Sequence, residues 1–203
     1  MRAILSLSTL LLASSLSAQT LEKGERDFAM SHLHMSRKLF LDSIEGLSPA
    51  QLNFKASPDR WSIAECAEHI TLSEDLIFGL ASVQIMKTPV VSERQTAATN
   101  KSKDQEILNQ VTDRTKKAQA PETLKPSHKW KAFDEMIAEY KVKRNRTIEY
   151  VEQTKDDVRG HIMAHPLLGK LDAYQWVLLL SSHSERHTLQ ILEVKADPGY
   201  PKK

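Results

Sequence analysis

Apolar side chains recur every three or four positions along four long segments of this 203-residue chain, and this spacing limits the possible folds more than any other feature. Such a period places the apolar residues on one face of an α-helix, whereas a half-buried β-strand needs strict alternation. Strand-like alternation is nearly absent. We therefore expect an all-α protein. The segments predicted to be helical are residues 21–47, 63–86, 130–154 and 173–195.

Two of these helices have clear start signals. Ser62 is followed three residues later by Glu65, which is the spacing of a capping box. In that motif each side chain accepts a backbone N–H that the first helical turn leaves unpaired. Asp172 and Gln175 have the same spacing at the start of the last segment. The second helix is expected to end before Pro89, because proline cannot continue a helix.

The middle of the chain, residues 87–127, is polar and contains three prolines. Residues 104–118 within it could form a shorter, solvated helix. No second hydrophobic core fits in so polar a stretch, so we interpret it as a long crossover connection. Four long helices with one long crossover predict a four-helix bundle, in which cofactor sites are built from side chains on facing helices. A single domain is expected over residues 19–203.

Residues 1–18 have the features of a secretory signal peptide. Arg2 is followed by an apolar run, residues 4–16, and then by the small residues Ser17 and Ala18. The run is shorter than the roughly 20 apolar residues that span a bilayer. An uncleaved membrane anchor is the alternative. We expect an exported protein, periplasmic or secreted, that has no stable membrane association after cleavage.

Charge and cysteine content narrow the expected partners. Removal of residues 1–18 leaves 27 basic and 26 acidic side chains. No large field of one sign then exists to attract nucleic acid or an anionic membrane, so a small-molecule substrate is the expected partner. Cys66 is the only cysteine, so stability must come from packing and not from an internal disulfide. A homodimer is compatible with the apolar ridges that bundles expose, but the sequence does not establish one.

Two histidine pairs have the i, i+4 spacing that places side chains one helical turn apart: His161 with His165, and His183 with His187. Pro166 follows the first pair directly, and a residue before proline is disfavoured in helical geometry. The first pair is therefore expected in a loop and not at a metal. The second pair lies in the middle of the last predicted helix.

His183 and His187 share an apolar stripe with Leu179, Leu180 and Ile191. Two imidazoles one turn apart on one face are what a shared metal ion requires. Unpaired burial of polar groups costs about 1–3 kcal/mol each, and a bound metal would remove that cost for both rings. On spacing alone, two core histidines with other hydrogen-bond partners remain an equally good interpretation.

The surrounding residues favour a mononuclear, nitrogen-rich site. The metalloprotease motif needs Glu directly after the first histidine, and here Ser184 follows His183. No Glu lies three residues before any histidine, so the carboxylate motif of di-iron bundles is missing. His69 is the natural third ligand, on a helical row with Leu72 and Leu76 that can face the bundle interior; a lone core histidine is the alternative. The histidines not expected to bind metal are His32, His34 and His128.

Three motifs in the chain resemble those of a known family. Residues 61–70, WSIAECAEHI, resemble the W-S-x-x-E-x-x-x-H-[IL] signature of the DinB-like proteins, also called DinB/YfiT-like metalloenzymes. Residues 165–171, HPLLGKL, and residues 183–191, HSERHTLQI, resemble the later H-P-x-x-G and H-x-x-x-H-x-x-Q-I segments. The resemblance covers about residues 25–197. The family name refers to DNA-damage induction and does not imply binding to nucleic acid.

The resemblance implies a four-helix bundle with an unusual long crossover. It also implies a histidine triad, which falls on His69, His183 and His187, the residues that helical spacing had already suggested. The implied cofactor is one divalent metal ion, Zn or Ni first, with Mn or Fe as further candidates.

Three neutral nitrogens leave positions on a divalent metal open for water or substrate, which suits hydrolysis or activation of a thiolate. Relatives in the family include thiol-dependent S-transferases and proteins described as hydrolases. Low-molecular-weight thiols act mainly in the cytoplasm, so predicted export favours a metal-dependent hydrolase of a small substrate. A metal-dependent thiol S-transferase and a non-catalytic, metal-stabilised binding module are the alternatives. Gln190 or Glu65, although not ligands themselves, could orient the metal-binding side chains.

Overall fold

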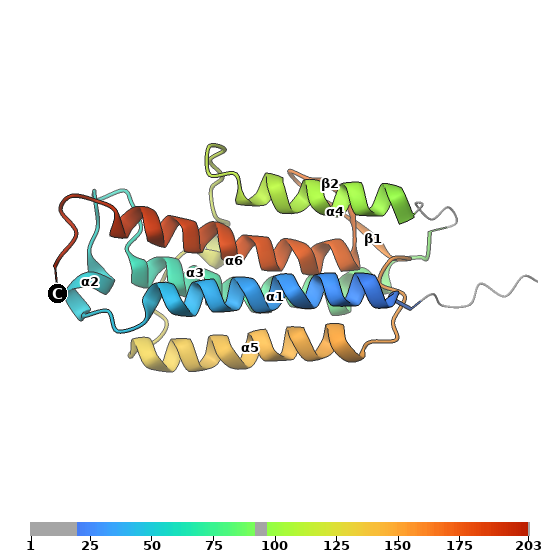
Figure 1. Cartoon of the computed structure of the whole chain (residues 1–203), viewed down its shortest axis with the longest axis horizontal. Helices are drawn as coiled ribbons and strands as arrows, with labels where there is room; N and C mark the ends of the chain where they lie inside the picture. The colour runs from blue at the N-terminus through green and yellow to red at the C-terminus, as the bar shows by residue number, and fades with distance from the viewer. Residues whose placement is uncertain (1–19, 92–96, 203) are drawn as a thin grey trace, which may run out of the picture.

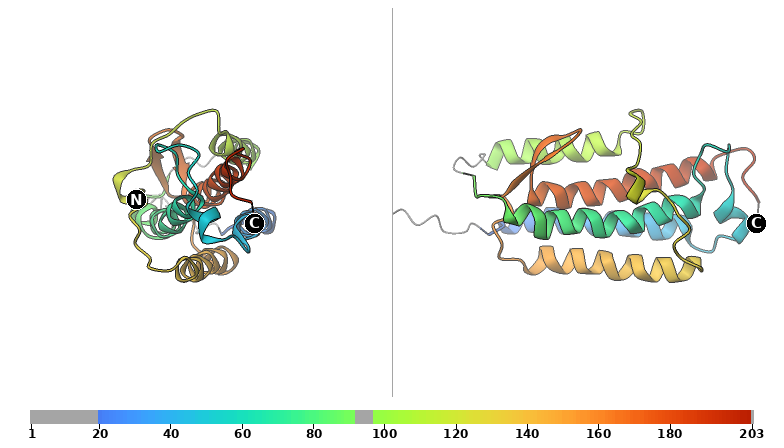
Figure 2. Two further views of the ribbon diagram at one scale, coloured as in Figure 1. Left: turned by 90° about the vertical axis from the view of Figure 1, so that its left-hand side faces the viewer. Right: turned by 180° about the vertical axis from the view of Figure 1, so that it is seen from behind.

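The computed structural model describes residues 20–91 and 97–202, so the predicted signal peptide lies outside the described residues. Four long helices lie side by side as a bundle (Figure 1). In cross-section, α1 and α3 each lie between α5 and α6 (Figure 2). The predicted four-helix bundle is confirmed. Its helices are α1 (Lys23–Ile44), α3 (Ile63–Gly79), α5 (Phe133–Gln153) and α6 (Ala173–Lys195).

The predicted capping boxes form at both helices. The Ser62 hydroxyl accepts the Glu65 N–H at the start of α3, and the Asp172 carboxylate accepts the Gln175 N–H at the start of α6. α3 continues through a π-helical turn, η1 (Leu80–Gln84), and a 3₁₀ turn, η2 (Ile85–Lys87), so the helical path ends before Pro89 as expected.

The first helix is shorter than the predicted residues 21–47. It ends at Ile44, and Gly46 takes a φ of 64°, a left-handed conformation that glycine adopts without steric cost. A short helix, α2 (Pro49–Asn53), follows, and Ser48 is its N-cap residue.

The crossover contains a helix whose predicted bounds, residues 104–118, were wrong. The observed helix is α4 (Ala97–Thr112), which lies along α6 outside the four-helix bundle (Figure 1). The chain turns after Thr112, where the Asp113 carboxylate accepts the Thr115 N–H at 3.0 Å. Arg186 of α6 also binds carbonyl groups at this end of the helix, which satisfies acceptors that a longer helix would have paired internally.

α4 is less solvated than predicted, since Ile107 and Leu108 are only 1% and 5% exposed. One guanidinium fixes it to the bundle. Arg159 donates to Asp104 of α4 at 2.6 and 3.0 Å, to Glu25 of α1 at 2.9 Å, and to the α6 cap Asp172 at 3.0 Å. A single arginine therefore ties the crossover helix to two helices of the bundle.

One short β-hairpin, which the sequence did not predict, interrupts the otherwise helical structure of the described residues. A hairpin of β1 (Ile162–His165) and β2 (Gly169–Asp172) precedes α6, with His165 paired to Gly169 across the turn. Gly169 has a φ of 73°, which the tight turn requires. Each strand has only four residues, too few for alternation to stand out in the sequence. The hairpin leads directly into the Asp172 cap of α6.

A buried ion pair lies in the core of the bundle. Arg144 of α5 and Glu74 of α3 are 0% and 1% exposed at their side chains, and the Arg144 Nε donates to both carboxylate oxygens at 3.2 and 3.1 Å. The remaining Arg144 N–H groups reach Ser36 of α1 and Ser184 of α6, both at 2.7 Å. All four helices of the bundle therefore meet at one guanidinium.

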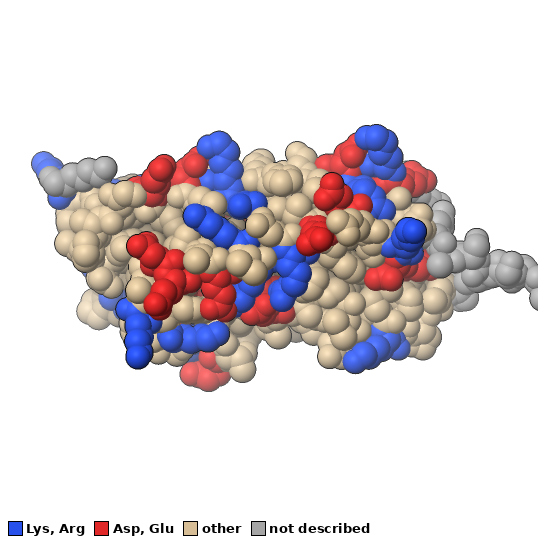
Figure 3. Space-filling view, turned by 90° about the horizontal axis from the view of Figure 1, so that it is seen from below, with Lys and Arg blue, Asp and Glu red and all other residues tan. Residues whose placement is uncertain are grey.

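The outer surface mixes charges of both signs. On the face seen from the α5 side, acidic and basic side chains are intermixed (Figure 3). Asp75 of α3 pairs with both Lys143 and Arg146 of α5. This face has no field of one sign, in keeping with the balanced composition. In the described part of the chain, no helix has both the length and the apolar character needed to cross a membrane.

Candidate metal centre

His69 of α3 meets His183 and His187 of α6 in one cluster. One ring nitrogen from each histidine lies within 4.8 Å of the others, close enough for the three to hold a metal ion. The ring centroids are 4.9 Å apart for His69 and His183, 4.3 Å for His69 and His187, and 4.6 Å for the pair on α6. The structure therefore brings together the three residues that the sequence had grouped.

Hydrogen bonds fix the proton positions of two of the rings. His69 Nδ1 lies 2.7 Å from the Leu124 carbonyl oxygen, which can only accept, so Nδ1 carries the proton. His187 Nδ1 lies 3.0 Å from Gln190 Oε1, and Arg114 Nη1 donates to the same oxygen at 3.3 Å. An arginine cannot accept, so this atom is the amide oxygen and His187 Nδ1 donates to it. Both histidines keep an Nε2 lone pair free for a metal.

His183 completes the donor set. Its Nε2 lies 3.2 Å from His69 Nε2, and because the His69 proton is on Nδ1, His183 Nε2 carries the proton between them when no cation is bound. Its Nδ1 is buried and has no hydrogen-bond partner among the described residues. A divalent ion would take the place of the shared proton. Three imidazole nitrogens suit borderline metals such as Zn²⁺ and Ni²⁺, so the residues present fit the implied cofactor.

Burial keeps the three imidazoles neutral. Desolvation lowers the pKa of His69 below its ordinary value of 6.5, and it lowers the pKa values of His183 and His187 well below it. The charge of a neighbouring imidazole lowers the latter two further. Since only the neutral ring can bind a metal, the cluster is in its metal-binding form near pH 7.

An aromatic ring covers one side of the cluster. The Trp61 ring lies 4.9 Å from the His69 ring and 6.0 Å from the His187 ring, measured between centroids. His69 and His187 are 2% and 8% exposed, whereas His183 is partly exposed. His183 is therefore the most solvent-exposed of the three residues.

Backbone groups occupy the Nδ1 atoms of the other i, i+4 pair, His161 and His165. His161 Nδ1 donates to the Thr88 carbonyl at 2.6 Å. His165 Nδ1 accepts the N–H groups of Leu167 and Leu168, both at 3.2 Å. The expected loop is a strand and turn. Among residues 20–91 and 97–202, the triad is the one cluster found of three or more His, Cys, Asp or Glu side chains that could share an ion.

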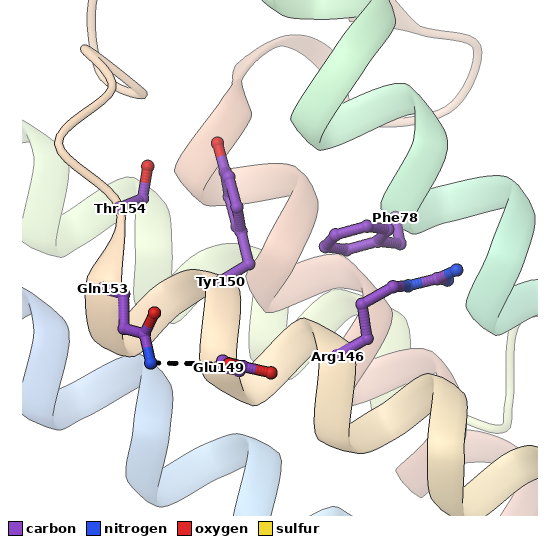
Figure 4. Close-up of a pocket in the computed structure, with 6 residues that line it drawn as sticks. All are labelled: Phe78, Arg146, Glu149, Tyr150, Gln153 and Thr154. Carbon is purple, nitrogen blue, oxygen red and sulfur yellow. Dashed lines mark hydrogen bonds between the residues drawn. The ribbon is translucent and has the colours of Figure 1, made fainter.

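A surface pocket lies between α3 and α5 (Figure 4). In it the Arg146 guanidinium stacks on the Phe78 ring, 4.4 Å from the centroid. None of the three histidines lines it. The residues around this pocket are Phe78, Arg146, Glu149, Tyr150, Gln153 and Thr154.

Two residues were expected to orient the ligands. Gln190 does contact His187, whereas the Glu65 carboxylate has other partners. Glu65 accepts the Ser62 N–H at 2.7 Å and pairs with Lys55 at 3.0 Å. Sequence reasoning missed two groups of the crossover: the Leu124 carbonyl, which binds His69, and Arg114, which binds Gln190. The sequence gives no local signal for them, because their positions depend on how residues 87–127 fold back.

Replacing Gln190 by leucine should weaken metal binding about 10- to 100-fold, the usual effect of losing a partner behind a metal-bound imidazole. The change removes the acceptor that orients His187 and leaves the ring itself in place. Competition with a chromophoric chelator measures the affinity. Gln153→Leu, an exposed glutamine on α5, is the matched control, and equal affinities for both variants would contradict the role of Gln190.

Comparison with known proteins places the chain in a family. A model of the DinB superfamily matches residues 32–191. The chain is 27% identical over 166 residues to the uncharacterised protein YuaE of Bacillus subtilis (strain 168), covering 82% of this chain and 96% of YuaE.

Two solved structures share the fold. TT2238, described as a four-helix bundle protein, superposes with a TM-score of 0.50 at 20% identity, over 83% of this chain and 98% of its own. YfiT from Bacillus subtilis, described as "a probable metal-dependent hydrolase with an unusual four-helix bundle topology", has a TM-score of 0.56 at 15% identity, over 90% and 93%. The chain, with its long crossover and its W-S-x-x-E-x-x-x-H and H-x-x-x-H motifs, belongs to the DinB superfamily.

Proposed function

We propose that this protein binds one divalent metal ion through His69, His183 and His187 and uses it to hydrolyse a small substrate. The observation that carries the proposal is the convergence of three ring nitrogens within 4.8 Å, with the opposite nitrogens of His69 and His187 already held by acceptors. Such an arrangement orients the ligands before a metal arrives, which raises affinity by reducing the ordering cost.

The chain's own residues have distinct tasks in this proposal. Leu124 and Gln190 hold the rings of His69 and His187, and Trp61 excludes water from one side of the cluster. The partly exposed His183 marks the side from which substrate would approach. When bound, the metal would supply Lewis-acid chemistry with positions open for water and substrate. The description of YfiT as "a probable metal-dependent hydrolase" supports the same reaction class.

The three histidine nitrogens also favour some metal ions over others. Neutral imidazoles favour Zn²⁺ and Ni²⁺ over harder ions that prefer carboxylates, and no carboxylate joins the three histidines in the described cluster. We therefore expect Zn or Ni, with Mn and Fe as weaker candidates.

The test uses protein purified without an affinity tag, since a histidine tag would bind metal itself. Elemental analysis is expected to find about one divalent ion per chain, and added Zn²⁺ or Ni²⁺ should raise the melting temperature of chelated protein. A panel of carboxylic ester, amide and phosphoester substrates, assayed with and without chelator, then measures metal-dependent turnover. Absence of bound metal, together with no thermal shift by Zn, Ni, Mn or Fe, would contradict the proposal.

Circular dichroism after chelation separates catalysis from a structural role of the metal. Metal-dependent turnover in a chain that stays folded without metal supports the hydrolase. Loss of the fold on chelation, without turnover on any substrate, supports a metal that joins α3 to α6 in a non-catalytic module.

A further inference from the structure

Glu68 directly precedes His69 on α3, and it is a buried acid, only 4% exposed. Its carboxylate accepts hydrogen bonds from one short stretch, residues 127–129, where the crossover leads into α5. The donors are the backbone N–H groups of Ser127 at 3.0 Å, His128 at 3.1 Å and Lys129 at 3.0 Å, and the Ser127 hydroxyl at 3.3 Å. One acid on α3 therefore binds three consecutive peptide groups.

Consecutive N–H groups that point at one carboxylate resemble the backbone arrangement by which proteins hold anions. Hydrogen bonds to a charged acceptor are also stronger than those between neutral groups. His128, at the middle of this arrangement, has a φ of 57°, in the left-handed region that residues other than glycine seldom adopt. Strained backbone of this kind persists only where its surroundings determine it, and here Glu68 supplies the determining contact.

The crossover also supplies the hydrogen-bond partner of His69, close in sequence to the stretch that Glu68 binds. Leu124, at the end of η3 (Glu122–Leu124), accepts the His69 Nδ1 proton at 2.7 Å, three residues before the stretch that Glu68 binds. Adjacent residues of a helix point about 100° apart. Glu68 and His69 therefore bind different parts of residues 124–129: Glu68 binds the N–H groups of 127–129, and His69 binds the carbonyl of Leu124.

We propose that Glu68 is a positioning residue for the metal centre. It fixes the end of the crossover so that the Leu124 carbonyl holds the His69 ring with Nε2 facing His183 and His187. This inference rests on the proposed metal site. It assigns to the crossover a second role besides connecting α3 to α5, since one of its peptide groups sets the tautomer of a ligand.

Glu68→Gln tests the proposal, because an amide presents two N–H groups of its own to three N–H donors and cannot accept them all. We expect metal affinity to fall about 10- to 100-fold, as for loss of other groups that orient a ligand. The matched control is Glu65→Gln, one turn earlier on α3, whose carboxylate caps the helix without contact to residues 124–129. It should keep the wild-type affinity.

Nitrogen-15 NMR of the imidazoles in metal-free protein gives a readout that a merely structural role would not change. In the wild type His69 should be the Nδ1–H tautomer with a slowly exchanging proton. In Glu68→Gln the proton should exchange quickly and the two tautomers should mix. Ser127→Ala, which removes only the hydroxyl donor, is a milder variant that should fold and show a smaller shift in the same direction.

The outcomes separate this inference from the proposed function. Wild-type tautomer and affinity in Glu68→Gln would overturn the role of Glu68 while leaving the metal site in place. Equal losses in Glu68→Gln and Glu65→Gln would also overturn it, because general destabilisation of α3 would then explain both. A wild-type protein that binds no metal would instead contradict the metal site, and the tautomer measurement would still decide whether Glu68 orients His69.

Discussion

Replacing His183 by alanine should abolish specific metal binding and any metal-dependent turnover. The change removes one of three ring nitrogens that lie within 4.8 Å of one another, and the two that remain cannot close the site. Removing a group that only orients a ligand weakens metal binding by up to about 100-fold. Removing a ligand itself should weaken it by more than about 100-fold. Isothermal titration with Zn²⁺ and Ni²⁺ measures the affinity, and the substrate panel measures turnover.

The control for this variant is His34→Ala, which removes an exposed histidine of α1 far from the ligands in sequence. It should retain the wild-type affinity. Thermal unfolding of both metal-free variants checks that the bundle is intact, and His187→Ala provides a second ligand deletion if His183→Ala fails to fold. Metal binding of wild-type strength in both ligand variants would rule out the triad.

Replacing Arg144 by methionine should lower the free energy of unfolding of the metal-free protein by about 3–5 kcal/mol, the usual effect of removing one partner of a buried ion pair. The change leaves the Glu74 carboxylate at 1% exposure without its guanidinium. It also removes the donors that reach Ser36 and Ser184, and so loosens contacts to α1 and α6. Urea denaturation followed by circular dichroism measures the effect.

The same two helices offer a matched control. Arg146 of α5 pairs with Asp75 of α3 at 2.8 Å, and both side chains are about half exposed, at 47% and 48%. Arg146→Met should cost less than about 1 kcal/mol, because water screens the exposed pair. The double variant Arg144→Met with Glu74→Leu should recover much of the loss, since no unpaired charge remains in the core. A cost for Arg144→Met as small as that of the control would mean that Glu74 finds another partner.

The sequence by itself determined the four long helices, apart from the exact positions of some of their ends, and the i, i+4 ligand pair, because both depend on short-range geometry. The α6 bounds agree with the predicted 173–195, since the Asp172 cap and the apolar period are local features. His183 and His187 lie one turn apart in any helix that contains them. The grouping with His69 came from its row on the capped helix and from the family motifs.

Tertiary structure decided the features that join distant parts of the chain. His69 lies 114 positions from His183 and 55 from Leu124, and no local pattern can indicate which peptide group will reach an imidazole across such distances. The bounds of α4 and the short hairpin likewise follow from contacts with α6 and from strand pairing. Helical period and capping are set within a few residues, whereas the orientation of the metal ligands is set by packing between helices and by the return of the crossover.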